Sequence, residues 1–378
     1  MSIRSKIAYS IVAAGLVGFG SGAASAKELT FAGYTSSNHV VAQEAILPFF
    51  EDVAKRTNGS LTFRFSPVGE LLKAKAIGPG VEDGLAEAGQ VISLVYVNEL
   101  PHYHVINQAM IYASGSLAAN GAALELCYLA YPECNEDYKK RGLVHLGDYS
   151  TTNYYNFICR EEVTSLDDLK GRRVRGLSTA GRWAESAGAL AVNMTSAEMV
   201  EALQTGGQVE CATAPIAWIT NYSLMDTIKS VLVVERGAYP AINFMTMNRD
   251  TWNDLSTTEK QAIIDALPMG IANAAVKGYV DLDEKTRKEA EARGTKFIKV
   301  DDEKLDALYA EFLKSEEALL AKRFEENQIE GATEAIATFR KLLIKWKGII
   351  DNLPEVTPVA YAKTLEDNVF SKIKPEDL

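Results

Sequence analysis

Hydrophobic residues along this chain recur with two different spacings. Short runs that are continuously apolar, or that alternate with polar residues, predict strands, and longer runs with apolar positions three and four residues apart predict helices. The predicted strands are 28–33, 61–65, 91–97, 143–147, 153–159, 173–175, 208–212, 230–235 and 296–300. The predicted helices are 39–56, 74–88, 117–140, 197–205, 216–222, 256–293, 302–327, 332–352 and 358–371, with a further one after Thr179. Strands that alternate with helices build mostly parallel sheets, so we predict an α/β fold.

The order of these elements indicates two lobes. Residues 27–150 together with 244–300 are predicted to form one α/β lobe, residues 151–243 a second, and residues 301–378 helices that pack across both. The chain crosses between the lobes near 150–153 and 241–244. We therefore expect a cleft between two bodies that can close on a ligand, with the C-terminal helices bracing them.

The stretch from residue 169 to residue 215 carries the clearest candidate for binding chemistry. Arg175 ends a short predicted strand in this stretch, and in open α/β sheets ligands bind outside the carboxyl ends of the strands. A guanidinium at that place, beside Gly176, can hold a carboxylate through two parallel hydrogen bonds. The alternative is a surface arginine in a basic cluster with Arg172 and Arg173.

The first 26 residues have the pattern of a secretory signal peptide. Arg4 and Lys6 precede an apolar run, and the segment ends in Ala24-Ser25-Ala26, which fits cleavage after Ala26. We therefore expect an exported, periplasmic protein, with an uncleaved anchor as the alternative. Removing these two cations from 39 basic residues leaves 37 against 50 acidic ones, a net charge of −13. This charge argues against nucleic acid as a partner and against a polybasic membrane anchor.

Four cysteines in an exported protein are typical of two disulfides, and three pairings are possible. Cys127 and Cys134 flank the end of one predicted helix, whereas Cys159 and Cys211 end two predicted strands of the second lobe. We predict the pairs 127–134 and 159–211. Zinc binding is the alternative, although the spacing resembles no metal knuckle.

Residues typical of catalysis are scarce. The chain has 4 histidines, and two of them, His102 and His104, follow Pro101 and could hold a metal if they lay on a strand. Because no third ligand is near in sequence, we interpret them as an ordinary loop pair. The mature chain has no P-loop, dinucleotide fingerprint, G-x-S-x-G or H-E-x-x-H motif. We predict a binding protein that uses no cofactor and no metal, with a secreted metal-dependent enzyme as the alternative.

Several segments, in order, resemble the solute receptors of TRAP (tripartite ATP-independent periplasmic) transporters, which are similar to C4-dicarboxylate receptors. The segments are Gly171-Arg172-Arg173-Val174-Arg175, Ala187-Gly188-Ala189 with Val192, Glu198 with Ala202-Leu203-Gln204-Thr205-Gly206, Val209-Glu210, and the stretches 57–59 and 249–256. The resemblance implies a two-lobe periplasmic binding protein fold and a carboxylate ligand held by Arg175. It also implies the permease subunits of a TRAP transporter as partners. A receptor for another transporter or a sensor is the alternative, and we expect a monomer.

The chain departs from the family pattern near the expected ligand. Ala214 stands where sialic-acid-like receptors have an asparagine that bonds to the acid group, and Leu190-Ala191 stand where a proline is usual. These differences favour a small or apolar acid over a sugar acid. We expect further ligand-binding residues to flank the cleft. The first four residues in the list below have large aromatic side chains, for which packing in the core is the alternative. The further residues are Trp183, Trp218, Tyr239, Phe244, Asn243, Tyr34 and Asn153.

Overall fold

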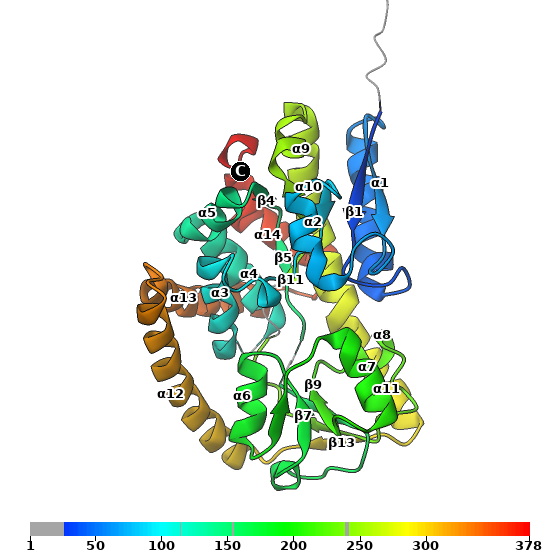
Figure 1. The fold of residues 1–378 in the computed structure, drawn as a ribbon, viewed down its shortest axis with the longest axis vertical. Helices are drawn as coiled ribbons and strands as arrows, with labels where there is room; N and C mark the ends of the chain where they lie inside the picture. Colours follow the sequence, from blue (N-terminus) through cyan, green and yellow to red (C-terminus); the bar gives the residue numbers. More distant parts are fainter. Residues whose placement is uncertain (1–25, 114, 153–154, 239–241) are drawn as a thin grey trace, which may run out of the picture.

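The computed structural model describes residues 26–113, 115–152, 155–238 and 242–378. Two lobes lie one above the other, and long helices run along both sides of the molecule (Figure 1). The predicted signal peptide up to residue 25, Asn153 and Tyr239 lie outside the described residues. In the described ranges, no helix combines the length and the apolar character that crossing a membrane requires.

The upper lobe, called the first lobe below, is built on a five-stranded sheet in the order β2-β1-β3-β12-β4. Its strands are β1 (Lys27–Ala32), β2 (Leu61–Ser66), β3 (Ala88–Gly89), β12 (Thr246–Asn248) and β4 (Leu143–His145). Strand β1 pairs parallel with β2 and β3, whereas β12 pairs antiparallel with β3 and β4. Phe31 of β1 packs this sheet against a helix, since its ring lies 5.2 Å from that of Phe50 in the helix Leu47–Arg56, and it also stacks on Phe65 of β2 at 6.1 Å.

The lower lobe, called the second lobe, is built on a six-stranded sheet in the order β13-β10-β6-β9-β7-β8. Its strands are β6 (Phe157–Cys159), β7 (Arg173–Arg175), β8 (Leu190–Val192), β9 (Cys211–Thr213), β10 (Ser230–Val233) and β13 (Lys296–Lys299). Strand β7 pairs parallel with both β8 and β9. The carboxyl ends of these three strands therefore point the same way.

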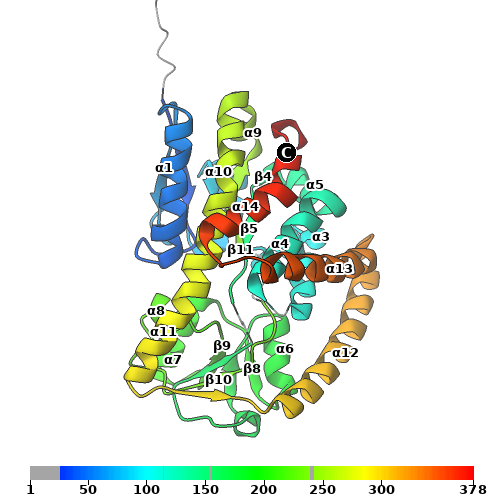
Figure 2. The same ribbon diagram turned by 180° about the vertical axis from the view of Figure 1, so that it is seen from behind.

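The lobes are joined by short strands and by long helices. An antiparallel pair, β5 (Asp148–Tyr149) with β11 (Ile242–Asn243), lies where the chain crosses between the lobes. On one side α10 (Thr257–Ala275), the π-helical turn η7 (Val276–Val280) and α11 (Asp281–Ala292) form a nearly continuous rod along both lobes (Figure 2). On the other side α12 (Asp302–Glu326) follows β13 and runs from the second lobe to the first (Figure 1).

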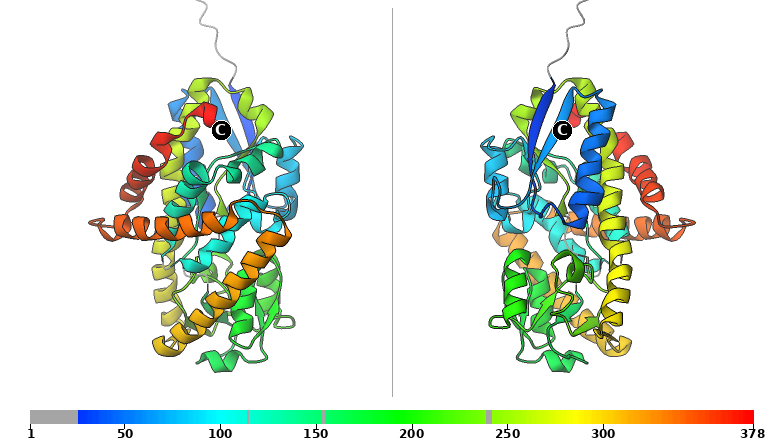
Figure 3. Two further views of the ribbon diagram at one scale, coloured as in Figure 1. Left: turned by 90° about the vertical axis from the view of Figure 1, so that its left-hand side faces the viewer. Right: turned by 90° about the vertical axis from the view of Figure 1, so that its right-hand side faces the viewer.

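The last two helices return to the first lobe. Helix α13 (Ala332–Asp351) packs on α3 (Pro101–Ala109) and α4 (Ser116–Glu125), and α14 (Pro358–Asn368) packs on α10 (Figure 3). The other α-helices are α1 (Leu47–Arg56), α2 (Ile77–Glu82), α5 (Glu133–Lys140), α6 (Thr179–Ser186), α7 (Ser196–Thr205), α8 (Trp218–Asn221) and α9 (Arg249–Asn253). The shorter helical turns are η1 (Ala42–Ile46), η2 (Ala74–Ala76), η3 (Ser93–Val95), η4 (Met110–Tyr112), η5 (Leu126–Ala130), η6 (Leu166–Leu169), η8 (Phe370–Lys372) and η9 (Pro375–Asp377).

One predicted strand is wrong, and one predicted helix is broken into shorter pieces. The apolar run 91–97 is not a strand, because β3 ends at Gly89 and residues 93–95 form a 3₁₀ turn. The Val91 N–H is bonded to Asn243 Oδ1 (3.4 Å) and not to a neighbouring strand. The predicted helix 117–140 is interrupted before α5, where Pro132 cannot donate the hydrogen bond of a helix interior.

Two strands of the second sheet differ from the prediction. Strand β8 was not predicted, because Leu190–Val192 is only three residues long and none of its three residues is buried. The predicted strand 296–300 was assigned to the first lobe, yet β13 pairs parallel with β10 in the second sheet. The predicted domain boundaries therefore differ from the sheet membership at this strand.

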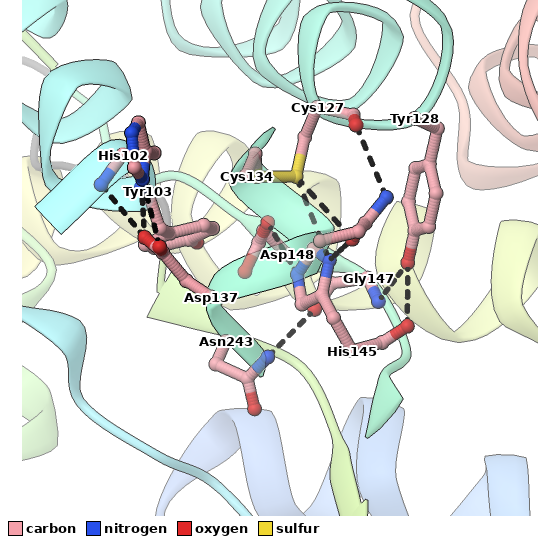
Figure 4. The surroundings of a disulfide bond; sticks show 11 residues. His102, Tyr103, Cys127, Tyr128, Cys134, Asp137, His145, Gly147, Asp148 and Asn243 are labelled. Carbon is pink, nitrogen blue, oxygen red and sulfur yellow. Dashed lines mark hydrogen bonds and ion pairs between the residues drawn. A yellow bond between two sulfur atoms is a disulfide. The ribbon is translucent and has the colours of Figure 1, made fainter. Parts of the chain in front are cut away.

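Both predicted disulfides are confirmed. Cys159 and Cys211 join the neighbouring strands β6 and β9, where they are directly opposite in the pairing register. Cys127 and Cys134 connect η5 to α5, beside a buried pair formed by His145 Nε2 and Asp148 Oδ2 at 2.8 Å (Figure 4). Both bonds lie in the interior, since all four cysteines are fully buried.

Candidate functional site

Arg175 ends strand β7 and lies at the carboxyl edge of the second sheet, fully buried. Its Nε donates to the carbonyl oxygen of Met194 at 3.0 Å and its Nη1 to that of Thr213 at 3.4 Å. These carbonyls belong to the segments that follow β8 and to β9, the two neighbours of β7. They orient the guanidinium without supplying any net negative charge.

Glycine lets the chain leave the strand at this point. A Cβ on Gly176 would lie 2.7 Å from the Cα and N of Gly181, which is far inside van der Waals contact. Only glycine therefore permits the first turns of α6 to pack directly on the end of β7. This close approach places the start of α6 beside Arg175, at the edge where the cleft begins.

Aromatic rings continue the site from Arg175 toward the first lobe. The guanidinium carbon of Arg175 lies 5.4 Å from the centre of the Trp218 ring, within the range of a cation–π contact. Trp218 meets Tyr222 edge to face at 5.3 Å. The hydroxyl of Tyr222 donates to Ser196 Oγ at 3.0 Å, and Ser196 begins α7.

This chain of contacts crosses the cleft. The Tyr34 hydroxyl lies 3.4 Å from the same Ser196 Oγ, and Tyr34 follows β1 in the first lobe. Gln90 Oε1, at the end of β3, accepts a hydrogen bond from the Tyr34 backbone N–H at 3.2 Å. His39 also lies close, 6.0 Å from the Tyr222 ring, and burial lowers the pKa of its imidazole to about 4. His39 is therefore neutral at pH 7.

A second set of contacts closes the cleft beside α3. Gln108 of the first lobe accepts a hydrogen bond at Oε1 from Thr179 Oγ1 (2.8 Å) and donates from Nε2 to Ser178 Oγ (3.3 Å). Arg182 also reaches Gln108 Oε1 at 3.4 Å. The two lobes therefore touch directly through polar side chains at two places, Tyr34 with Ser196 and Gln108 with Ser178 and Thr179.

A cavity of about 710 Å³ opens between the lobes. Its walls come from the first lobe (Leu94, Val97), from the second lobe (Leu177, Met194) and from α12 (Arg323). Met194 both lines this cavity and binds Arg175 through its carbonyl oxygen. Arg175 consequently lies behind the Met194 wall of this cavity.

The structure brings some of the predicted site residues together and separates others. Trp218 and Tyr34 belong to the group around Arg175 described above. Phe244 packs against Phe49 at 5.2 Å inside the first lobe. Trp183 lies in an aromatic cluster with Tyr309 and Phe312 of α12, and its Nε1 donates to the Tyr155 carbonyl.

Asn243 has a structural position, since it is fully buried and bonds Thr246 Oγ1 and the carbonyls of Gly147 and Met245. Asn153 and Tyr239 lie outside the described residues. Four further residues belong to the candidate site and were not predicted from the sequence: Tyr222, Ser196, His39 and Gln90. The only available signal was position, because each follows or starts an element whose end faces the cleft.

The two histidines considered for a metal site lie on a helix and not in a loop. Both belong to α3, which starts at Pro101 because a proline suits the first turn of a helix. His102 Nδ1 is 2.8 Å from Asp137 Oδ1, and His104 Nε2 accepts a hydrogen bond from Gln108 Nε2. Across the described ranges, no three side chains of His, Cys, Asp or Glu gather as metal ligands.

Residues 31–323 match the family described as bacterial extracellular solute-binding protein, family 7 (DctP). Three similar solved structures share the fold. A TRAP periplasmic solute-binding protein from Bordetella bronchiseptica with bound (R)- and (S)-mandelate is 21% identical, with 84% of this chain and 99% of that chain covered and a TM-score of 0.71.

A marine metagenome TRAP solute-binding protein specific for aromatic acids, in complex with 3-hydroxybenzoate, is 19% identical, with 85% and 99% covered and a TM-score of 0.72. A Bordetella pertussis extracytoplasmic solute receptor that binds pyroglutamic acid is 19% identical, with 83% and 100% covered and a TM-score of 0.68. No curated protein sequence matches the chain. The predicted two-lobe binding-protein fold with C-terminal helices is confirmed.

Proposed function

Because this chain belongs to family 7 of the bacterial extracellular solute-binding proteins, the DctP family of TRAP receptors, we propose that it captures an organic acid by its carboxylate at Arg175. The family consists of receptors and not enzymes, which corrects the alternative of a secreted metal-dependent enzyme. After capture, the closed receptor would hand the acid to the permease subunits of a TRAP transporter.

The observation that carries this proposal is the complete burial of Arg175 at the carboxyl edge of the second sheet. Its guanidinium bonds two backbone carbonyls and faces the Trp218 ring. A buried cation is stabilised most strongly by an anion that offers matching hydrogen bonds, and a carboxylate fits the planar guanidinium fork. The Arg175 guanidinium is therefore suited to holding one carboxylate group of the ligand.

The groups beyond Arg175 support an acid with a flat or apolar body. Trp218 and Tyr222 supply ring faces and edges, whereas Ser196 and Tyr34 supply hydroxyl groups on the far side. Ala214, which is fully buried, offers no side-chain hydrogen bond. Mandelate and 3-hydroxybenzoate, which similar proteins bind, combine a carboxylate with an aromatic ring and a hydroxyl. We propose acids of this kind as the first candidates.

The test is a thermal-shift screen over monocarboxylates, dicarboxylates and aromatic acids, followed by calorimetry on variants. A ligand that binds only the folded protein raises stability by roughly 2.7 kcal/mol at a hundredfold excess over Kd. Arg175→Ala should then lose on the order of 3 to 5 kcal/mol of affinity, because one partner of a desolvated charge pair is removed. Arg175→Lys keeps the charge but not the fork, so it should recover only part of the loss.

Arg172→Ala is the matched control. Arg172 lies two residues before the strand residue Val174 and pairs at the surface with Glu161 (3.0 Å), so its loss should leave affinity unchanged. If Arg175→Ala binds the best acid within threefold of wild type, or if Arg172→Ala loses as much, Arg175 is not the anchor. Delivery is tested separately, by asking whether uptake of the labelled acid through the permease requires this receptor.

A further inference from the structure

The cavity between the lobes carries a cluster of positive charge on a strongly acidic protein. Three cations line it, Lys75 from η2 in the first lobe, Arg182 from α6 in the second, and Arg323 from α12. Glu198 is the one acidic side chain that lines it among the described residues. The whole chain, in contrast, has a formal net charge of −11.

The positive charges differ in how far they are already neutralised. Arg182 is bound to the buried Glu316 through two hydrogen bonds of 2.6 Å. Lys75 and Arg323 are exposed, and neither has an ion pair with another described residue. Lys75 and Arg323 therefore supply the excess positive charge, and they stand on different walls of the cavity.

The pKa values of two groups that line the cavity, Glu198 and His104, are lowered in part by the positive charges near them. Hydrogen bonds from Thr195 hold the pKa of Glu198 below its usual value, and the charges of Lys75 and Arg175 act in the same direction. Burial lowers the pKa of His104 to about 4, with further contributions from Arg182 and Arg323. His104 is thus neutral at pH 7 and Glu198 is charged, which leaves the cations in excess.

We propose that Lys75 and Arg323 form an electropositive vestibule that draws an anionic ligand into the cleft and sets its association rate. Met194 lines the vestibule, and its carbonyl oxygen accepts a hydrogen bond from Arg175. An anion inside the vestibule is therefore separated from the buried Arg175 by Met194 alone. A ligand of like sign to the whole protein would otherwise be repelled at long range. Local fields in a cleft can overcome that repulsion and raise association rates by 10-fold or more.

This inference rests on the proposed function, because the vestibule acts on the same carboxylate ligand that Arg175 holds. It adds a kinetic role for two residues outside the anchor. The sign of the salt dependence of the association rate shows which charges act on the ligand, the cations of the vestibule or the net negative charge of the whole protein. Attraction by the vestibule makes the rate fall as salt rises, whereas repulsion by the net negative charge makes it rise.

The experiment is stopped-flow fluorescence with Trp218 as the reporter. The first probe is (R)-mandelate, and the tightest-binding monocarboxylate of the screen replaces it if that acid binds more tightly than (R)-mandelate. Association and dissociation rates are measured from 20 mM to 1 M salt on wild type and on Lys75→Glu/Arg323→Glu. At 20 mM salt, where the Debye length is roughly 20 Å, the double variant should associate about 10-fold more slowly. At 1 M salt the rates should agree within about twofold, and dissociation rates should not change.

The control variant is Lys347→Glu/Lys363→Glu, which makes the same change in net charge on exposed residues of α13 and α14. Its association rate should stay within twofold of wild type. The vestibule is wrong if the test variant also stays within twofold at 20 mM salt, or if the control slows equally. A faster dissociation that persists at 1 M salt would instead make Lys75 or Arg323 a direct ligand contact. If no acid in the screen binds wild type, the proposed function itself fails, and the vestibule with it.

Discussion

Asp283 on α11 holds the crossing between the lobes, and its protonation should make the stability of the protein depend on pH. Its carboxylate accepts a hydrogen bond from the Ala217 N–H at 2.5 Å and another from the Thr152 hydroxyl. Ala217 precedes Trp218 at the start of α8, and Thr152 lies at the crossing. Burial raises the pKa of Asp283 to about 6, although the two hydrogen bonds act in the opposite direction.

The sign of the effect follows from this raised pKa. Between about pH 4, where an unfolded aspartate titrates, and about pH 6, the folded state binds more protons than the unfolded state. The free energy of unfolding therefore loses a contribution as pH rises through this window. A shift of about two pH units corresponds to about 3 kcal/mol, of which about 2 kcal/mol develops between pH 4.5 and pH 7.5.

Asp283→Asn removes the titration and keeps the shape of the side chain. The amide oxygen can still accept from Ala217, and the amide nitrogen can donate to the Thr152 oxygen. The free energy of unfolding is measured by urea denaturation with the disulfides intact, at pH 4.5 and at pH 7.5. The stability of the variant relative to wild type should increase by about 2 kcal/mol from the lower to the higher pH.

The comparison across pH cancels any constant change in packing or hydrogen bonding. Glu289→Gln, at an exposed position of the same helix, is the control and should show no such increase. If the relative stability of Asp283→Asn changes by less than about 0.5 kcal/mol between the two pH values, or if the control changes equally, the carboxylate titrates normally and the reasoning is refuted.

Two further predictions concern packing and covalent structure. Replacing Cys159 and Cys211 by alanine should lower the free energy of unfolding by about 4 kcal/mol in the chain-entropy model, because the bond spans 52 residues. Replacing Cys127 and Cys134, which are 7 residues apart, should lower it by about 2.5 kcal/mol. Equal losses in urea denaturation would contradict this. Gly121→Ala places a Cβ 2.3 Å from the buried Trp346 ring and should cost about 1–3 kcal/mol, while Gly348→Ala meets no atom within 4 Å and should stabilise α13 by up to about 1 kcal/mol. Thermal melts that rank these two glycine variants in the reverse order would show that α4 and α13 do not pack as described.

Most elements could be predicted from the sequence because their signals are local. Helix α7 is an example, since Thr195 and Glu198 form a capping box before it and Gly206 ends it with a positive φ of 72°. Helix α10 has the same signal in Ser256 and Glu259. In each case the residues that decide the boundary lie within a few positions of it.

The failures occurred where distant contacts decide the conformation. The run 91–97 has the composition of a buried strand, but its N-terminal N–H is bonded by Asn243, which is 152 residues away. Burial alone explains why this run is apolar, and burial does not distinguish a strand from a packed turn. Strand β13 shows the same limit, because nothing near residue 296 indicates that its neighbour is β10.

The candidate site also contains residues that local sequence could predict and residues that only distant contacts bring into place. Arg175 could be singled out because the rule that ligands bind beyond strand ends needs only the local order of elements, and its role as the anchor stays a prediction. Its orienting partners could not be predicted, because they are backbone carbonyls of Met194 and Thr213 and every residue has a carbonyl. The contact between Tyr34 and Ser196 joins residues 162 positions apart and exists only because the lobes meet.

The aromatic residues show why composition could not identify the ligand-binding set. Trp183 and Trp218 are both almost completely buried in the second lobe, and both follow strand ends in sequence. Yet Trp183 packs against Tyr309 and Phe312 of α12, whereas Trp218 packs against Arg175. A large ring is equally suited to filling a core and to lining a cleft. The difference lies in what stands opposite the ring, a bracing helix in one case and a buried cation in the other, so the site follows from the position of Arg175 and not from the number of aromatic residues near it.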